Sequence, residues 1–136
     1  MWEVYGLKNE DFLWAGVAFR GGIAGQQQAT CGAVSASALV LGLRHRCSIA
    51  DKEKAEKSRD AANEDAGELV RSFIREFGAV TCFGLLGVDF SDEEAMRQAR
   101  DSGLFKEKCP KQVQFVIQKL YELDEKRSSP GNPGKL

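Results

Sequence analysis

The sequence predicts an all-α protein, a single-domain bundle of five or six helices with a glycine-rich loop. Apolar residues recur at helical spacing, and no segment alternates as a half-buried strand does. The 136 residues suffice for one domain, and a hydrophobic fraction of 43% with a charged fraction of 29% is typical of a globular chain. We expect a helical domain over residues 1–127 and a disordered tail rich in Ser, Pro and Gly over 128–136.

The first part of the chain is expected to form two helices joined by a glycine-rich loop. Residues 8–19 are predicted as the first helix, with Asn9 as its N-cap. Its expected buried residues are Phe12, Trp14, Ala15 and Phe19. Residues 21–25 include three glycines, which permit positive φ and indicate a tight turn. The next helix covers about 31–43 and is apolar on nearly every side, which favours a buried position.

The clearest amphipathic helix ends before Gly78, which stands where a C-terminal glycine stops a helix. Its apolar residues trace one face at a period of 3.6: Ala55, Ala62, Ala66, Leu69, Val70, Phe73 and Phe77. The charged run over 51–65 is expected to face solvent or a partner. A short helix follows Ser91-Asp92 and closes near Gly103.

The last helix is predicted to begin at Cys109-Pro110, because proline is favoured in the first turn of a helix. Its expected core stripe is Val113, Val116, Ile117, Leu120 and Tyr121. We expect the second, third and last long helices to meet around the cysteines.

Charge and hydropathy exclude several classes of partner. With 19 basic and 20 acidic residues the net charge is -1, which gives the chain no bulk attraction for nucleic acid or anionic lipid. The longest nearly apolar run, 33–43, is too short to span a bilayer. The N-terminus lacks the pattern of a signal peptide, so we expect a cytoplasmic protein.

Four cysteines carry most of the chemical information. No pair has the Cys-x-x-Cys spacing of zinc knuckles or thioredoxin-type motifs. Cys31, Cys82 and Cys109 are each expected at or beside the start of a helix, where unpaired N–H groups favour a thiolate. These three are therefore the candidate redox thiols and the candidate metal ligands. The alternative is that they are small buried apolar side chains.

Two further residues have no predicted role in this site. His45 lies between two arginines at the end of a helix, and we expect it to be a solvent-facing cation. Cys47 precedes Ser48 in a polar segment, and we expect its substitution to change little.

The segments Phe19-Arg20-Gly21-Gly22-Ile23 and Cys31-Gly32-Ala33 resemble the redox-active C_GCAxxG_C_C family, and the resemblance covers about residues 12–120. It implies a small helical domain in which Cys31, Cys82 and Cys109 belong to one redox or metal site. It also makes Gly21, Gly22 and Gly32 the candidate cofactor-contacting residues. Two features depart from the family. Ala36 replaces the last glycine of the motif, and no cysteine precedes Cys31 in place of the family's first.

Two functions remain open at this point, beside a thiol-disulfide enzyme that uses Cys31 as its nucleophile. In the first, the cysteines bind zinc or an iron–sulfur cluster, or they form a reversible disulfide. In the second, the chain is a non-catalytic helical interaction protein with structural cysteines. A homodimer is expected in either case, and the resemblance adds an electron-transfer or transporter-associated partner. Whether the protein is an enzyme stays open.

Overall fold

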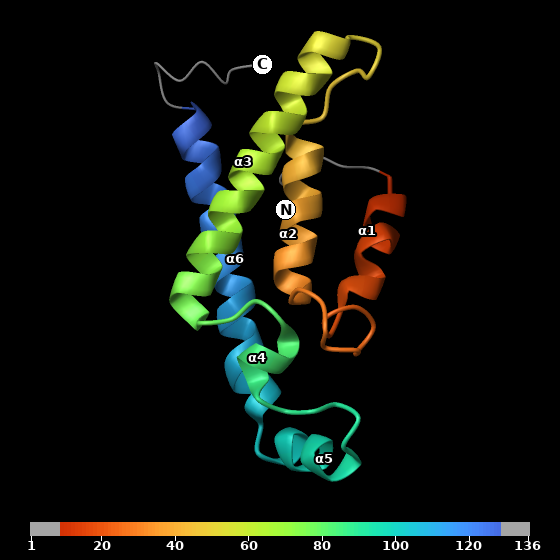
Figure 1. The fold of residues 1–136 in the computed structure, drawn as a ribbon, viewed down its shortest axis with the longest axis vertical. Helices are drawn as coiled ribbons and strands as arrows, with labels where there is room; N and C mark the ends of the chain where they lie inside the picture. Colours follow the sequence, from red (N-terminus) through yellow and green to blue (C-terminus); the bar gives the residue numbers. More distant parts are fainter. Residues whose placement is uncertain (1–8, 129–136) are drawn as a thin grey trace.

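Three long helices form the body of the protein: α2 (Gly32–Arg44), α3 (Lys52–Phe77) and α6 (Leu104–Ser128). The structure is a computed structural model that describes residues 9–128. These three helices pack against one another, with α2 and α6 running in the direction opposite to α3 (Figure 1). Within the described residues there are six α-helices and no strand, which confirms the predicted all-α class.

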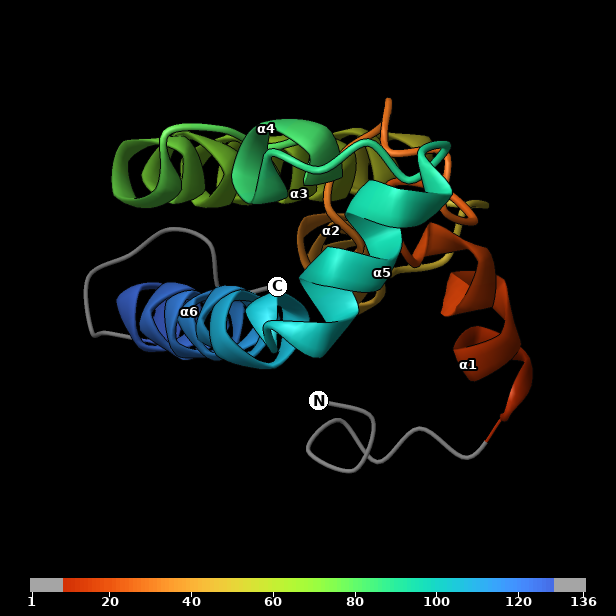
Figure 2. The ribbon, with the colours of Figure 1, turned by 90° about the horizontal axis from the view of Figure 1, so that it is seen from below.

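Four shorter elements complete the fold. They are α1 (Asp11–Gly16), the 3-10 helix η1 (Val17–Phe19), α4 (Cys82–Leu86) and α5 (Glu93–Asp101). Helix α1 flanks α2, whereas α4 and α5 close one end of the three-helix body. Figure 2 looks onto this end and shows α5 lying across it, close to the first turns of α6. The chain therefore has one capped end and one end formed by the long helices alone.

Helix ends follow the sequence signals closely in the middle of the chain. The Asp51 carboxylate accepts a hydrogen bond from the N–H of Lys54 and begins α3. Gly78, at φ 76°, ends the same helix in the left-handed conformation, as predicted. The short helix predicted after Ser91-Asp92 is present as α5, but its cap is Asp92, which accepts hydrogen bonds from two N–H groups of the first turn, and not the Ser91 of the predicted capping box.

The core runs along the seam of α2, α3 and α6. Leu41, Leu69 and Phe73 are almost completely buried there. The rings of Phe73, Phe77 and Phe115 contact one another edge to face or tilted, with centroids 4.7 to 5.9 Å apart. Leu85 and Leu86 of α4 extend the same core toward the capped end. The apolar face predicted for α3 is thus the face that packs.

The first and last helices differ from prediction. The predicted helix over 8–19 is a short α1 followed by η1, and its residues Phe12, Gly16 and Phe19 are the half-buried ones. Trp14 is 73% exposed, and Ala15 is exposed too, because this helix covers only one side of α2.

The core stripe of α6 is rotated from the predicted one. Its buried residues are Gln112, Val116, Leu120 and Leu123. Val113, Ile117 and Tyr121, which share a neighbouring face, are exposed instead. The hydrophobic pattern alone was ambiguous here, because apolar residues occupy both faces of the helix.

No described helix combines the length and the apolar character needed to cross a bilayer. Helix α6 ends at Ser128, so the remainder of the tail predicted over 128–136 lies outside the described residues.

Candidate functional site

The two segments that lead into Cys31 and Cys82 are joined through the backbone. Thr30 and Thr81 form an isolated antiparallel β-bridge. The N–H of Cys31 donates to the carbonyl of Val80 at 2.7 Å. Each cysteine follows its threonine directly, Cys31 as the N-cap of α2 and Cys82 as the first residue of α4. The bridge therefore brings the two cysteines close together although they are distant in sequence.

Cys109 lies near Cys31 and Cys82, but it is inside a helix and not at the start of one. The prediction that it begins the last helix is wrong, because Gly103 at φ 75° ends the preceding turn and α6 already begins at Leu104. Pro110 consequently lies inside the helix, where it lacks the N–H that would bond to the carbonyl of Lys106. Cys109 thus gains nothing from a helix N-terminus.

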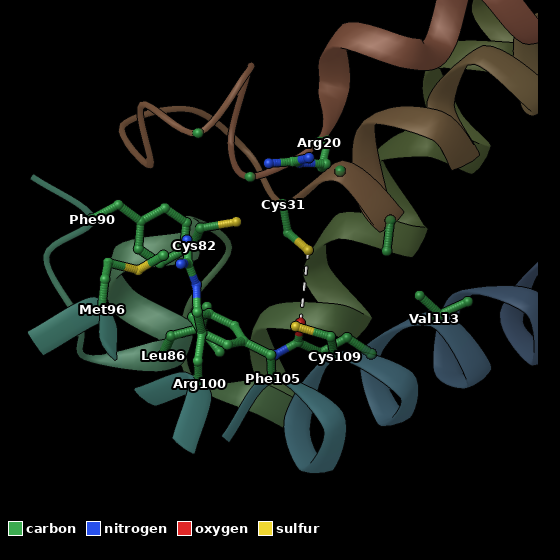
Figure 3. A pocket seen from close by; sticks show the side chains of 15 residues that line it. Arg20, Cys31, Cys82, Leu86, Phe90, Met96, Arg100, Phe105, Cys109 and Val113 are labelled. Atoms are coloured by element: carbon green, nitrogen blue, oxygen red, sulfur yellow. Dashed lines mark hydrogen bonds between the residues drawn. The ribbon is translucent and has the colours of Figure 1, made fainter. Parts of the chain in front are cut away.

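Cys31, Cys82 and Cys109 line one pocket of about 440 Å³, which is within the size range of small-molecule sites. Figure 3 shows their sulfur atoms facing the middle of this pocket, which we call the cysteine pocket. Cys31 and Cys82 are each 7% exposed, and Cys109 is half-buried. Most of the remaining wall is apolar and comes from α4, α5, α6 and the connection between α4 and α5: Leu86, Phe90, Met96, Phe105 and Val113.

Burial decides the ionisation of two of these thiols. It raises the pKa of Cys82 to about 11, and the neighbouring Cys31 and Cys109 act in the same direction. A hydrogen bond from the backbone of Gly32 lowers the pKa of Cys82 without reversing the effect. Burial, followed by the proximity of Cys31, also raises the pKa of Cys109. The sequence-based expectation of lowered pKa values is therefore wrong for both: burial outweighs the helix start at Cys82, and Cys109 has no helix start to oppose burial.

Two buried glutamines organise the pocket, and the sequence analysis missed both. The thiol of Cys31 donates to Oε1 of Gln112 at 3.8 Å (Figure 3). Gln27 donates to the carbonyl of Val88 and accepts from the N–H of Phe90 at 2.5 Å. Gln27 thereby fastens the segment before α5 to the glycine-rich loop. The position of Gln112 could have been inferred from the sequence, because it is a polar residue at helical spacing from Val116 and Leu120. No sequence pattern indicates that Gln27 is buried.

The glycine-rich loop forms a wall of the pocket by close backbone packing. Residues 21–25 all have positive φ, which is a turn of left-handed backbone. A Cβ at Gly22 would lie 2.7 Å from the carbonyl oxygen of Ala29, and one at Gly32 would lie 2.8 Å from that of Phe19. Gly21 and Gly32 line the pocket, whereas Gly22 is buried behind it. Gly22 thus has a packing role in the structure, and the cofactor contact expected of it stays a prediction.

His45 belongs to a separate buried charge cluster, so its predicted solvent-facing position is wrong. Its Nε2 lies 2.8 Å from Oδ2 of Asp65, which is 2% exposed. Arg127 donates to both oxygens of the same carboxylate, at 2.7 and 2.8 Å, and Arg44 stands 3.5 Å from it. Asp65 is also the one charged residue of the predicted solvent-facing run over 51–65 that is buried. These residues, the Asp65 cluster, join α2, α3 and α6 at the end away from the cysteines.

The fourth cysteine stays apart from the other three. Cys47 is half-buried in the connection between α2 and α3 and does not line the cysteine pocket. All four cysteines are free thiols. Across residues 9–128, no three His, Cys, Asp or Glu side chains are grouped as metal ligands.

Comparison with known proteins places this geometry in a family. The family model described as "Putative redox-active protein (C_GCAxxG_C_C)" matches residues 1–123, which is most of the chain and includes all three pocket cysteines. Searches of curated proteins and of solved structures found no match. The matched range includes the glycine-rich loop, the Thr30–Thr81 bridge and nearly all of α6. The chain therefore belongs to the C_GCAxxG_C_C family of redox-active cysteine proteins.

Proposed function

We propose that this protein is a thiol redox protein in which Cys31 and Cys82 form a reversible disulfide. The observation that carries the proposal is the Thr30–Thr81 bridge, which fixes the backbones of the two residues immediately before these cysteines. A disulfide requires two cysteine Cα atoms within about 7 Å, and segments paired in this way are suited to that separation.

The chemistry is a two-electron exchange. One pocket thiolate attacks a sulfur of an external disulfide, and one thiol of that compound leaves. The second cysteine then attacks the mixed disulfide and releases the other thiol. The protein loses two electrons and two protons, and the external disulfide gains both. Reduction by an external dithiol reverses these steps.

Cys31 is the thiol that interacts with both of the others. Its proximity raises the pKa of Cys82 and of Cys109, and its own thiol donates a hydrogen bond to Gln112. Cys109 is accordingly the alternative partner of Cys31. We expect Cys31 to appear in every disulfide that the pocket forms, and the backbone bridge favours Cys82 as its first partner.

A metal centre is the second candidate function. Three cysteines on one pocket have the donor chemistry of zinc or iron–sulfur sites. The geometry of the described residues does not fit such a centre, because no three potential ligands are grouped. The disulfide needs only two of the thiols and fits with a smaller movement. Zinc or a cluster is therefore the less supported proposal.

An assembly role is supported by a different surface. Val113, Ile117 and Tyr121 form an exposed apolar row on α6, and Leu13, Trp14 and Val17 are exposed on α1. Exposed apolar rows of this kind are typical of interfaces. We propose a homodimer, and light scattering should give about twice the chain mass of 14.9 kDa. A concentration-independent mass near that of one chain would contradict it.

The deciding experiment combines metal analysis with disulfide mapping. Protein purified without oxygen is analysed for zinc and iron, then oxidised with diamide and digested for peptide mapping. We expect a Cys31–Cys82 cross-link and the loss of two thiols. Cys31→Ser should abolish the cross-link, and Cys47→Ser, the matched control outside the pocket, should not. Stoichiometric metal held by the three cysteines would replace the disulfide proposal.

A further inference from the structure

The cysteine pocket has a charge pattern that its thiols do not require. Arg20 and Arg100 both line it, and none of its other lining residues is acidic. Within residues 9–128 neither guanidinium has a side-chain hydrogen bond or an ion pair, whereas Arg44 and Arg127 are held by Asp65 or its neighbours. Two arginines without carboxylate partners therefore face a pocket whose floor is apolar.

The two arginines come from separate parts of the fold. Arg20 follows η1 and precedes the left-handed turn, and Arg100 is in the last turn of α5. In Figure 3 they lie on different sides of the pocket, Arg20 near Cys31 and Arg100 near Leu86 and Cys82. Both are exposed at its rim. A ligand bound in the pocket therefore lies near these two positive charges.

Three features thus converge on one kind of ligand. Thiols at the centre select a compound with an exchangeable sulfur, the apolar wall accepts a short carbon chain, and the arginines favour carboxylates, which they bind in a bidentate manner. We propose that the cysteine pocket recognises a small disulfide bearing carboxylate groups, which is the oxidant that forms the protein disulfide. This inference rests on the proposed thiol redox function and names the substrate class of the same site.

The exchange balances without any other reactant. The carboxylate-bearing disulfide loses one thiol when a pocket thiolate attacks it and a second thiol when the partner cysteine resolves the mixed disulfide. Two molecules of carboxylate-bearing thiol leave, and each carries a proton that the protein thiols have given up. The arginines hold the carboxylates during both steps and take no part in the electron transfer.

The test compares three disulfides of similar size and different charge. They are dithiodipropionate, which is anionic, hydroxyethyl disulfide, which is neutral, and cystamine, which is cationic. The rate at which each oxidises the reduced protein is divided by its rate with a neutral, unstructured cysteine peptide, which removes intrinsic reactivity. We expect the normalised rate for dithiodipropionate to exceed that for hydroxyethyl disulfide about tenfold at low salt, with cystamine slowest, and the advantage to shrink as salt screens the arginines.

Variants that remove single positive charges test whether the two pocket arginines cause the preference for the anionic disulfide. Arg20→Gln and Arg100→Gln should each lower the ratio of the dithiodipropionate rate to the hydroxyethyl disulfide rate by several-fold, because only the anionic compound loses a charge partner. Both side chains are exposed and unpaired within the described residues, so the variants should fold. Arg97→Gln is the matched control, because Arg97 is also on α5 but pairs with Glu94 and does not line the pocket.

Two outcomes would overturn the inference, and they differ from failure of the proposed function. Equal normalised rates for the three compounds, or an equal loss in the Arg97 variant, would show that the pocket does not select carboxylates while leaving the disulfide function intact. Failure of all three compounds to oxidise Cys31 and Cys82 would remove the thiol redox function itself.

Discussion

The Asp65 cluster and the cysteine pocket lie toward opposite ends of the same three-helix body. Each contains a buried acidic group, but the pKa of that group is shifted in opposite directions. Burial raises the pKa of Asp65, but hydrogen bonds from Arg127 and His45 outweigh it, so the pKa is lowered overall. Burial also raises the pKa of Cys82, and no cation opposes it. Loss of solvent is common to the two regions, so the partners decide the ionisation state. One end holds a permanent charge, and the other holds neutral thiols.

The largest expected loss of stability comes from removing the carboxylate charge of the Asp65 cluster. Asp65→Asn leaves Arg127, Arg44 and His45 without their shared carboxylate, and breaking a buried pair in this way costs about 3–5 kcal/mol. Urea denaturation measures the loss. Glu64→Gln, which affects only the exposed partner of Arg127, should cost under about 0.5 kcal/mol. Similar losses in the two variants would show that the cluster is not held by Asp65.

The pocket end depends on backbone packing more than on charge. Gly22→Ala should destabilise by about 2–3 kcal/mol, because a Cβ would meet the carbonyl of Ala29 and φ is 62°. Gly25→Ala, at φ 88° but with open space around the new Cβ, should lose about 1 kcal/mol. Thermal denaturation of both variants separates the cost of the close contact at Gly22 from the cost of positive φ, which the two positions share. Equal losses would mean that the close approach to Ala29 contributes nothing.

The two ends should respond to opposite limits of pH. The lowered pKa of Asp65 contributes stability that is present above its ordinary value of 3.8 and is lost as the pH falls through the folded value. The raised pKa of Cys82 contributes stability that is present below its ordinary value of 9.0 and is lost as the pH rises toward about 11.

We expect the alkaline loss to be about 2 kcal/mol, less than the full shift implies because solvent reaches the pocket. Urea midpoints measured from pH 8 to 11 test it. Cys82→Ser should reduce the alkaline loss of stability to the part that the raised pKa of Cys109 contributes, and it should leave the acid loss unchanged. Asp65→Asn should remove the acid loss and leave the alkaline loss unchanged. An alkaline loss of full size in Cys82→Ser would assign it to a group other than Cys82.

The smallest effect is expected at Cys47, which belongs to neither end. Cys47→Ser should change the free energy of unfolding by no more than about 0.5 kcal/mol and leave the cross-link of the pocket intact. Thermal denaturation and peptide mapping on the same sample check both points. Loss of the cross-link would mean that Cys47 takes part in the thiol chemistry.

Local signals in the sequence predicted much of the fold. The spacing of Leu69, Val70, Phe73 and Phe77 identified the packed face of α3, and Gly78 and Asp92 marked helix ends correctly. These features depend on neighbouring residues alone. The exposed Ile117 and Tyr121 were misplaced, because which of two apolar faces is buried depends on how α6 packs against α2 and α3.

For the candidate site, the sequence predicted which cysteines share a pocket but not their helix positions or pKa values, and their redox or metal role stays a prediction. The structure brings together Cys31, Cys82 and Cys109, but the expected helix terminus at Cys109 and the expected acidity did not follow. His45 could not be placed from sequence because its partner Asp65 is on another helix. The contacts of Gln27 with residues 88 and 90 are likewise invisible until the chain is folded.

The Thr30–Thr81 bridge also has a consequence for how the chain matures. Its two residues are 51 positions apart, with α2 and α3 between them, so we expect it to close after that helical hairpin has formed. In an unfolded chain the thiols are exposed to water and keep their ordinary acidity. We therefore expect a newly made chain to be more easily oxidised than the folded protein, in which the bridge and the apolar wall from α4 to α6 together shelter the sulfur atoms.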